Sequence, residues 1–379
     1  MIEMKENCAF SMQPLSSFLT EYKELNGEQN YRPVAVGRYG IRTRESIYSK
    51  ELAKDYSKNK VIRKNTLTVG MGSVQMDIGV LTDDVVYSVS PAYHTYQISD
   101  IDCDYLRFCL QARNNDMFLR YMKRGSRQGK SIDLNAWIKY QIPVYDESKQ
   151  SEIVASLQSV QRIIEQRQLE LQKLDDLVKA RFVEMFGTPF RNENHWEIKR
   201  IGDVVTEVRY GTSRPAVEGG KYPYLRMNNL TNDGCIDLNN LKRIDIPDDD
   251  EIEKCIVHKG DVLFNRTNSV ELVGKTAMFD LDEDMVIAGY IIRVRLKPCL
   301  LPEVLAQYMN LKQVKDLLHS MAKGAVNQAN INAQELQGIE VYLPDIDLQQ
   351  DFVNFKKQID KSKFVNPIRN QNGNQEVSQ

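Results

Sequence analysis

Apolar side chains in the middle of the chain recur at alternating spacings of four and three residues, the pattern of a helix that packs along one face. Over about residues 148–186 the apolar positions are Ile153, Leu157, Val160, Ile164, Leu171, Leu174, Val178 and Met185. Asp146 or Ser148 can cap this helix, and Gly187 followed by Pro189 ends it. At 1.5 Å per residue the predicted helix is a rod of about 55 Å, which favours a spacer over an ordinary core helix.

The same order of segments occurs before and after this helix. Short β-rich runs separated by glycines are followed by an amphipathic helix, over 104–122 in the first half and 302–321 in the second. A shift of 199 positions without a gap gives the identical pairs Leu106/Leu305, Met122/Met321, Gly125/Gly324, Ile132/Ile331, Asp146/Asp345, Gln150/Gln349 and Val154/Val353. The chain is therefore predicted to be a tandem of two α+β units, each with a mixed or mostly antiparallel sheet and helices.

The repeat divides the chain into five predicted segments. They are a first globular domain (1–145), the central helix (146–187), a second globular domain (188–343), a shorter helix (344–365) and a tail (366–379). The shorter helix repeats the apolar pattern with Leu348, Phe352, Phe355 and Ile359. The tail is rich in Asn and Gln, and we expect it to be disordered because it cannot bury enough apolar surface.

Composition excludes several classes of protein. The formal net charge of the 379 residues is −2, so any binding to nucleic acid must use local patches. No run approaches the roughly 18 apolar residues of a membrane span, and the first residues do not have the form of a signal peptide, so we expect a cytoplasmic protein. The six cysteines include no CxxC pair, which indicates neither a zinc site nor a disulfide framework.

Positive and amide side chains gather in predicted loops of both halves. Arg, Asn and Gln can form paired hydrogen bonds with base edges, and Lys suits phosphates, although a charged loop is often simply solvated. The candidate DNA-binding residues of the first half are Arg38, Arg42, Arg44, Lys64, Arg124, Arg127, Gln128 and Lys130. Those of the second half are Arg209, Tyr210, Thr212, Arg214, Arg226, Asn228, Asn229, Arg266, Asn268, Lys323, Asn327 and Gln328. Two similar units on a stiff spacer suit a repetitive linear partner, and duplex DNA is the first candidate.

The sequence contains no recognisable catalytic motif. A DNA methyltransferase would need Asn or Asp followed by Pro-Pro and an aromatic residue, and this chain has no Pro-Pro. The nearest phosphate-loop candidate, Val273-Gly274-Lys275-Thr276, has Ser269 where the first glycine is required. The four histidines lack metal-binding spacing. We therefore predict no catalytic residue, no metal site and no cofactor bound by this chain.

Both helical stretches resemble a known family. Residues 171–175 and 182–187 resemble the central conserved helix of the specificity subunit of type I restriction-modification systems, and residues 358–362 resemble its distal helix. Features similar to those of the target-recognition domains of this family are Ser90–Tyr93, Gly260–Phe264, Gly274-Lys275 and Gln328–Ile331. The resemblance extends to about residue 364.

The resemblance implies a noncatalytic subunit whose two target-recognition domains each recognise one half of a bipartite DNA sequence. The two helices would pack antiparallel, set the spacing between the half-sites and dock methyltransferase subunits, and a restriction subunit would complete the enzyme. S-adenosylmethionine, ATP and Mg would then belong to these partners. The predicted partner-helix interface comprises Ile153, Leu157, Val160, Ile164, Leu171, Leu174, Val178, Phe352, Phe355 and Ile359.

One feature departs from the family. Its distal helix usually continues as far as the central one, whereas the helical pattern here stops after Phe364. We expect the helix pair to cover about half of the central helix, leaving the stretch from Leu171 to Met185 open for a partner or a second copy of the chain. Two alternatives stay open: a coiled-coil scaffold that binds only protein, without sequence-specific DNA binding, and a self-sufficient nuclease or methyltransferase.

Overall fold

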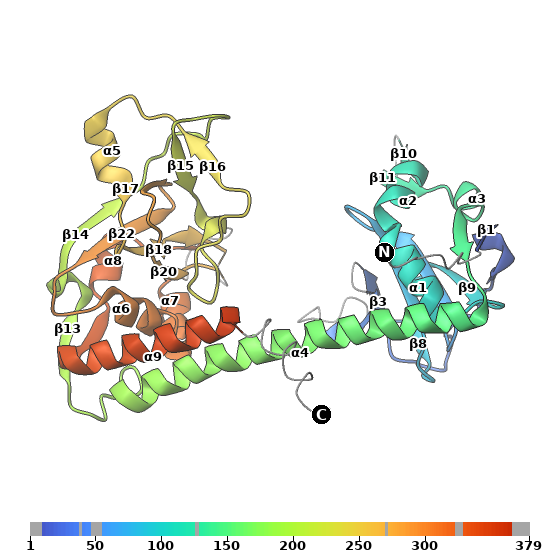
Figure 1. Cartoon of the computed structure of the whole chain (residues 1–379), viewed down its shortest axis with the longest axis horizontal. Coiled ribbons are helices and arrows are strands. Elements are labelled where there is room, and N and C mark those ends of the chain that lie inside the picture. The colour runs from blue at the N-terminus through green and yellow to red at the C-terminus, as the bar shows by residue number, and fades with distance from the viewer. Residues whose placement is uncertain are drawn as a thin grey trace, which may run out of the picture. The chain divides into compact units, whose positions relative to one another are not determined.

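The computed structural model describes residues 10–37, 40–46, 55–125, 129–269, 272–322 and 329–365. The chain divides into two compact units, residues 1–165 and 166–379. The helix α4 (Glu147–Phe186, 40 residues) contributes to both of them (Figure 1). The predicted tail, 366–379, lies outside the described residues. No helix within the described ranges is long and apolar enough to cross a membrane.

The first unit is built on a four-stranded antiparallel sheet. Its strands, in spatial order, are β2 (Leu19–Glu21), β9 (His94–Ile98), β6 (Thr66–Met71) and β7 (Met76–Leu81). The other strands form the pairs β1 (Ser11–Pro14) with β12 (Gln141–Val144), β3 (Val34–Gly37) with β4 (Gly40–Thr43), β5 (Lys60–Ile62) with β8 (Tyr87–Val89), and β10 (Met122–Gly125) with β11 (Gly129–Ile132). The central strand β6 is buried along almost its whole length, because the unit's helices and the hairpin β3–β4 pack around it.

Three helices complete the first unit: α1 (Cys103–Ala112), α2 (Asn114–Tyr121) and α3 (Leu134–Trp137). Asp102 caps α1 by accepting the backbone N–H of Tyr105 at 2.8 Å. Leu106, Leu110 and Trp137 are fully buried in one core with the sheet. The apolar spacing that predicted one helix over 104–122 therefore belongs to two helices, which meet at Arg113, whose backbone (φ −106°, ψ 5°) is not α-helical.

The second unit contains two four-stranded sheets. The first is antiparallel, in the order β14 (Val205–Tyr210), β22 (Ile291–Leu296), β18 (Val262–Asn265) and β20 (Thr276–Met278). The second is mixed, in the order β16 (Lys242–Ile244), β15 (Tyr222–Leu225), β21 (Met285–Ile287) and β17 (Ile256–Val257), with β15 and β21 parallel. Two further pairs are β13 (Glu197–Arg200) with β24 (Glu340–Leu343), and β19 (Thr267–Asn268) with β23 (Ala329–Asn330).

The helices of the second unit are α5 (Asp249–Cys255), α6 (Pro302–Met309), α7 (Lys312–Met321), α8 (Ala333–Gln337) and α9 (Ile346–Val365). The predicted helix over 302–321 is again two helices. Asn310 ends α6, because its Nδ2 donates to the carbonyl of Ala306 at 2.9 Å and to that of Thr276 at 2.6 Å, and Leu311 then takes an extended backbone. This break sets the direction in which α7 leaves α6.

In the second unit α9 runs antiparallel to the C-terminal half of α4 (Figure 1). The ring of Phe352 packs edge-on against Phe182 and Phe186, with centroids 5.1 and 5.6 Å apart. Further along α9, Lys363 Nζ forms an ion pair with Asp175 at 2.6 Å. Contacts from later residues of α9 thus reach earlier residues of α4, so the two helices are antiparallel. This confirms the predicted antiparallel pair of helices in a tandem α+β chain.

The expectation that Leu171 to Met185 would stay open is wrong. Val178 is 4% exposed, and α9 covers this stretch. Strand β13, which follows α4, pairs with β24, which precedes α9. The C-terminal end of α4 and the N-terminal end of α9 are therefore both next to this strand pair. For this reason α9 runs back along the C-terminal half of α4.

Gln150 and Gln349 lie in the first turns of the two long helices and make equivalent contacts in the two units. Both are buried, at 6% and 0% exposed. Oε1 of Gln150 accepts the N–H of Asp102 at 3.1 Å, and Oε1 of Gln349 accepts that of Leu301 at 2.9 Å. In each case Nε2 donates, at 2.8 Å, to the carbonyl five residues earlier. Asp102 and Leu301 are also 199 positions apart, so the repeat extends to individual hydrogen bonds.

We expect Gln349→Leu to lower the free energy of unfolding of the second unit by about 2–3 kcal/mol, because the N–H of Leu301 and the carbonyls of Cys299 and Pro344 lose the hydrogen bonds of the buried amide. Urea denaturation of the full chain measures this. Gln350→Leu is the matched control, since Gln350 is the exposed neighbour on α9 and should change stability by less than about 0.5 kcal/mol. Equal losses in the two variants would refute the anchoring role.

Candidate nucleic-acid interface

Several of the predicted DNA-binding residues cannot be placed. Arg38, Arg127, Gln128, Lys323, Asn327 and Gln328 lie outside the described residues. Arg124 is described only through its backbone, which pairs with Lys130 between β10 and β11. The other candidates are distributed over several elements of each unit.

In the first unit the placed candidates come from separate elements. Arg42 is exposed on β4, and Arg44 follows it, with its guanidinium 5.0 Å from the ring centroid of Tyr56. Lys64 is exposed in the turn between β5 and β6. Lys130 on β11 donates to the carbonyl of Ser73 at 3.2 Å. Arg42 and Arg44 are therefore neighbours, whereas Lys64 and Lys130 lie on other elements of the unit.

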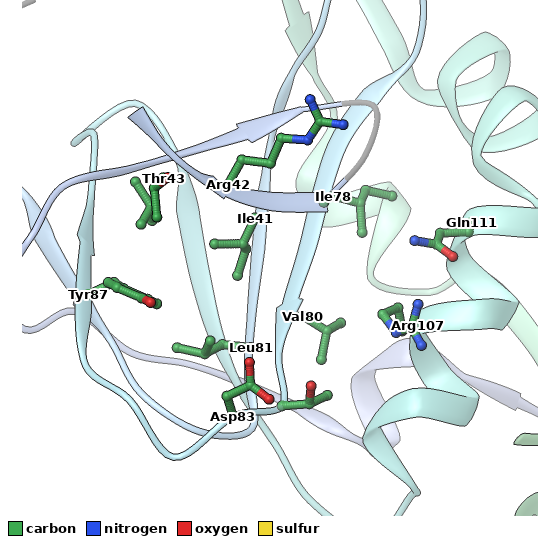
Figure 2. Close-up of a pocket in the computed structure, with 13 residues that line it drawn as sticks. Ile41, Arg42, Thr43, Ile78, Val80, Leu81, Asp83, Tyr87, Arg107 and Gln111 are labelled. Carbon is green, nitrogen blue, oxygen red and sulfur yellow. The ribbon is translucent and has the colours of Figure 1, made fainter. Parts of the chain in front are cut away.

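Arg42 lies at the edge of a hollow of about 250 Å³ between the hairpin β3–β4, strand β7 and helix α1 (Figure 2). Ile41, Val80 and Leu81 form its apolar wall. Arg107 also borders the hollow, but its guanidinium is paired with Asp104 at 2.7 Å. Asp83 also lines the hollow. The hollow therefore carries charges of both signs and does not by itself select an anion.

In the second unit two of the candidates are in direct contact. Tyr210 ends β14, and Arg266 directly follows β18, with the guanidinium carbon 4.8 Å from the centroid of the Tyr210 ring. The hydroxyl of Tyr210 accepts the N–H of Ala333 at 2.8 Å, which fixes the ring. The backbone of Arg266 donates to the carbonyl of Tyr290 at 2.9 Å and accepts from the N–H of Ile331 at 2.9 Å. Segments far apart in sequence therefore converge on this Arg–Tyr pair.

The chemistry of the Arg–Tyr pair suits a nucleic acid. Tyr210 and Tyr290 are 42% and 49% exposed, so aromatic surface is available for stacking. Nε of Arg266 is buried without a hydrogen-bond partner among the described residues, and no described carboxylate pairs with this guanidinium. Asn268 lies two residues further, in β19, whose partner strand is β23. A cation, exposed rings and an amide together can bind phosphates and base edges.

Three further candidates are held by carboxylates. Arg214 pairs with Glu251 at 2.7 Å, and the hydroxyl of Thr212 donates to the same carboxylate at 2.8 Å. The Arg214 contact lowers the pKa of Glu251, and Glu251 in turn raises the pKa of Arg214. Arg209 pairs with Glu207 at 3.0 Å. These ion pairs could not be predicted from the sequence, because each carboxylate neutralises the charge of its arginine only in the folded chain.

The loop after β15 uses one candidate for its own structure. Asn229 is 2% exposed; its Oδ1 accepts the N–H of Arg226 at 2.9 Å, and its Nδ2 donates to the carbonyl of Asp237 at 2.8 Å. Asn228 is exposed, and Arg226 reaches the carbonyl of Asn240 at 3.5 Å. In this loop the buried amide shapes the turn that carries Asn228 and Arg226.

A buried ionic network supports the strands beneath the Arg–Tyr pair, and the sequence analysis missed it. Arg293 on β22 is fully buried and pairs with Glu207 on β14 at 2.5 Å. Arg295 bonds Glu207 at 3.0 Å and Asp261 at 3.0 Å. Burial acts to raise the pKa of Glu207, but the neighbouring arginines outweigh it and lower that pKa. In the sequence, Arg293 within the apolar run Ile291–Leu296 was the feature that could have indicated this network.

Within the ranges that the structure describes, no group of three or more His, Cys, Asp or Glu side chains could hold a metal ion.

Comparisons with known proteins point to one family. Residues 193–371 match the type I restriction modification DNA specificity domain. The putative type I restriction enzyme MjaX specificity subunit of Methanocaldococcus jannaschii is 26% identical over 172 residues, covering 44% of this chain and 39% of that protein. The chain thus spans about two fifths of the length of this curated relative.

Solved structures extend the similarity to most of the chain. One solved structure comes from work on the complex assembly and conformational transition of the type I R-M system. It aligns with 15% identity over 95% of this chain and 92% of that chain, at a TM-score of 0.50. The S subunit of a type I restriction-modification system from M. genitalium aligns with 13% identity over 96% and 92%, at a TM-score of 0.46. The first alignment indicates a shared fold.

We expect Glu207→Ala to lower the free energy of unfolding of the second unit by about 3 kcal/mol, because it removes the closest carboxylate from the buried charge of Arg293. Glu197→Ala is the matched control: it removes an exposed carboxylate whose partner, Lys199, is partly exposed, so little change is expected. Urea denaturation compares the two variants. A loss in Glu207→Ala no larger than in the control would contradict the role of the network.

Proposed function

We propose that this chain is the noncatalytic DNA sequence-specificity subunit of a type I restriction-modification complex, because residues 193–371 match the type I restriction modification DNA specificity domain. Each unit recognises one half of a bipartite target. The observation that carries this proposal is the repeat: the family match lies on the second unit, and helices α1–α4 follow the order of α6–α9 and share the same glutamine contact. Two equivalent units suit a target with two half-sites.

In the second unit the Arg266–Tyr210 pair, together with Asn268, is the proposed centre of DNA contact. Its support is a guanidinium without a described carboxylate beside exposed aromatic rings. The remaining candidates among the described residues are also proposed as phosphate or base contacts: Arg42, Arg44, Lys64, Arg124, Lys130, Arg209, Thr212, Arg214, Arg226 and Asn228. Asn229 contributes through the shape of its turn, because its amide already has partners on both sides.

The helices are proposed to set the half-site spacing and to dock methyltransferase subunits in the cytoplasm. Leu157, Val160 and Ile164 on α4 are 40%, 53% and 51% exposed, so this part of the predicted interface offers apolar surface to a partner. Methyl transfer with S-adenosylmethionine, and cleavage with ATP and Mg by a restriction subunit, are assigned to the partners. A second copy of the chain is another candidate for the exposed part of α4.

Methylation mapping tests the proposal directly. The chain is purified with the methyltransferase subunit encoded beside it, and methylated bases are mapped in DNA exposed to the complex. We expect a two-part motif with a fixed unspecified gap. Exchange of residues 188–343 for those of a relative should alter one half of the motif and leave the other. Change in both halves, or in neither, would contradict modular recognition, and absence of any DNA-dependent activity would favour the protein-only scaffold.

A single substitution tests the proposed contact centre. We expect Arg266→Gln to weaken binding of the target duplex by roughly tenfold or more, because a lost contact to a base edge costs about 1–3 kcal/mol. Lys199→Gln is the control, since Lys199 is an exposed cation on β13 that already pairs with Glu197 at 2.6 Å. Fluorescence anisotropy with labelled duplex measures both. If the two variants bind as tightly as the unchanged chain, Arg266 is not a DNA contact.

A further inference from the structure

A recess in the second unit lies between the turn before β20 and helix α7, and the assignments above do not use it. Its volume is about 160 Å³, far above the ~10–15 Å³ that one water molecule needs. The side chains with basic nitrogens on its wall are Lys275, Lys315 and His319, and Asn232 and Asn310 also line it. No carboxylate among the described residues lines this recess. The wall is therefore positive.

Local sequence explains how the positive side chains come together. On α7, Lys315 and His319 are four residues apart and share one face, while Val314 and Leu318 are fully buried in the core. Opposite them, the turn passes through Gly274, whose φ of +81° favours glycine. A Cβ at Gly274 would lie 2.6 Å from the Leu318 side chain, so glycine also permits the close approach of the turn to α7.

The two lysines carry charge that the described residues do not balance. Lys315 Nζ donates to the carbonyl of Gly274 at 2.5 Å, which leaves two of its three N–H donors for the recess. No described carboxylate forms an ion pair with Lys315 or Lys275. Burial, reinforced by the nearby charge of Lys275, lowers the pKa of Lys315 to about 8, and burial also lowers the pKa of Lys275. Two cations that share a partly buried recess favour an anion between them.

The recess adjoins the proposed DNA contact centre through the sheet. The N–H of Asn265 donates to the carbonyl of Lys275 at 2.8 Å, and the N–H of Gly274 donates to the carbonyl of Asn265 at 2.8 Å. Arg266 is the residue after Asn265. Because neighbouring strands are about 4.8 Å apart, Lys275 lies close to the backbone of Arg266. The recess and Arg266 therefore belong to neighbouring segments of one sheet.

The geometry also distinguishes between possible sources of phosphate. In a nucleotide-binding phosphate loop the hydroxyl after the lysine holds Mg²⁺. Here the hydroxyl of Thr276 is buried and donates to the carbonyl of Gly274 at 3.1 Å, so it cannot take that role. The Gly-Lys-Thr segment thus presents a lysine without a magnesium ligand, which suits a phosphodiester better than a magnesium nucleotide.

We propose that this recess binds a backbone phosphate of duplex DNA, with Lys275 and Lys315 as its ligands and His319 as a third donor. The inference rests on the proposed function, because it supplies a sequence-independent contact beside the recognition centre. A phosphate held here fixes the register of the duplex while Arg266 and its neighbours contact base edges.

The test compares Lys275→Gln, Lys315→Gln and the double variant with Lys312→Gln. Lys312 is the control because it is exposed on the same helix and already pairs with Asp316 at 2.7 Å. Binding of the full chain to target and mixed-sequence duplexes is measured by anisotropy over a range of salt concentrations. We expect the double variant to bind both duplexes roughly threefold to tenfold more weakly, with a salt slope smaller by about 1 and an unchanged preference for the target.

The other outcomes are equally specific. If the recess variants bind like Lys312→Gln while Arg266→Gln loses affinity, the recess is not a phosphate site and the proposed function stands. If the unchanged chain binds no duplex, both proposals fail. Calorimetric titration with inorganic phosphate and with magnesium ATP separates the sources: tight ATP binding abolished by Lys315→Gln, without an effect on DNA, would overturn the DNA assignment.

Folding must be separated from binding in these variants. Removal of one of two neighbouring cations should leave the melting temperature unchanged or higher. Lys315→Arg, which keeps the charge, should retain the salt slope of the unchanged chain. A lower melting temperature together with lost DNA binding in Lys315→Arg would indicate a structural role for the lysine and would overturn the proposal.

Discussion

The buried glutamine at the start of each long helix is the contact on which the arrangement of each unit depends. The first turn of a helix and the residue that precedes another helix both carry backbone groups that need partners. Gln349 satisfies three of them at once: the N–H of Leu301 and the carbonyls of Cys299 and Pro344. Gln150 satisfies two such groups in the first unit, the N–H of Asp102 and the carbonyl of Tyr145. The long helix therefore leaves each unit from one fixed place, since any other orientation would leave buried polar groups unsatisfied.

This constraint explains which features of the fold could be predicted from sequence. Helix periodicity and a repeat without gaps are local or nearly local patterns, so the central helix and the tandem α+β organisation were predicted correctly. The position of α9 along α4 was not, because it depends on the pairing of β13 with β24, whose residues are far apart in sequence. The divisions at Arg113 and Asn310 were missed as well, since apolar spacing continues across both breaks.

The candidate site was predicted only in part, for a related reason. Sequence identified the arginines but could not show which carry uncompensated charge. Arg214 is 37 residues from its partner Glu251, and Arg293 is 86 residues from Glu207. In the folded second unit these ion pairs hold loops and strands together. Arg266, Lys275 and Lys315 form no ion pair with a described carboxylate, unlike Arg214 and Arg293, and this difference separates available cations from structural ones.

The near-neutral net charge of the chain, −2, bears on how the proposed DNA binding would work. A protein that bound DNA through overall charge would attract any duplex equally, whatever its sequence. In the described second unit many cations are paired with carboxylates, so under the proposed function an encounter would have to align the duplex with the cations that are not paired. Under the proposed function, specificity would come from geometry: the turn at Gly274 and the Tyr210 ring hold those groups on rigid elements, where a displaced base edge would lose its hydrogen bonds.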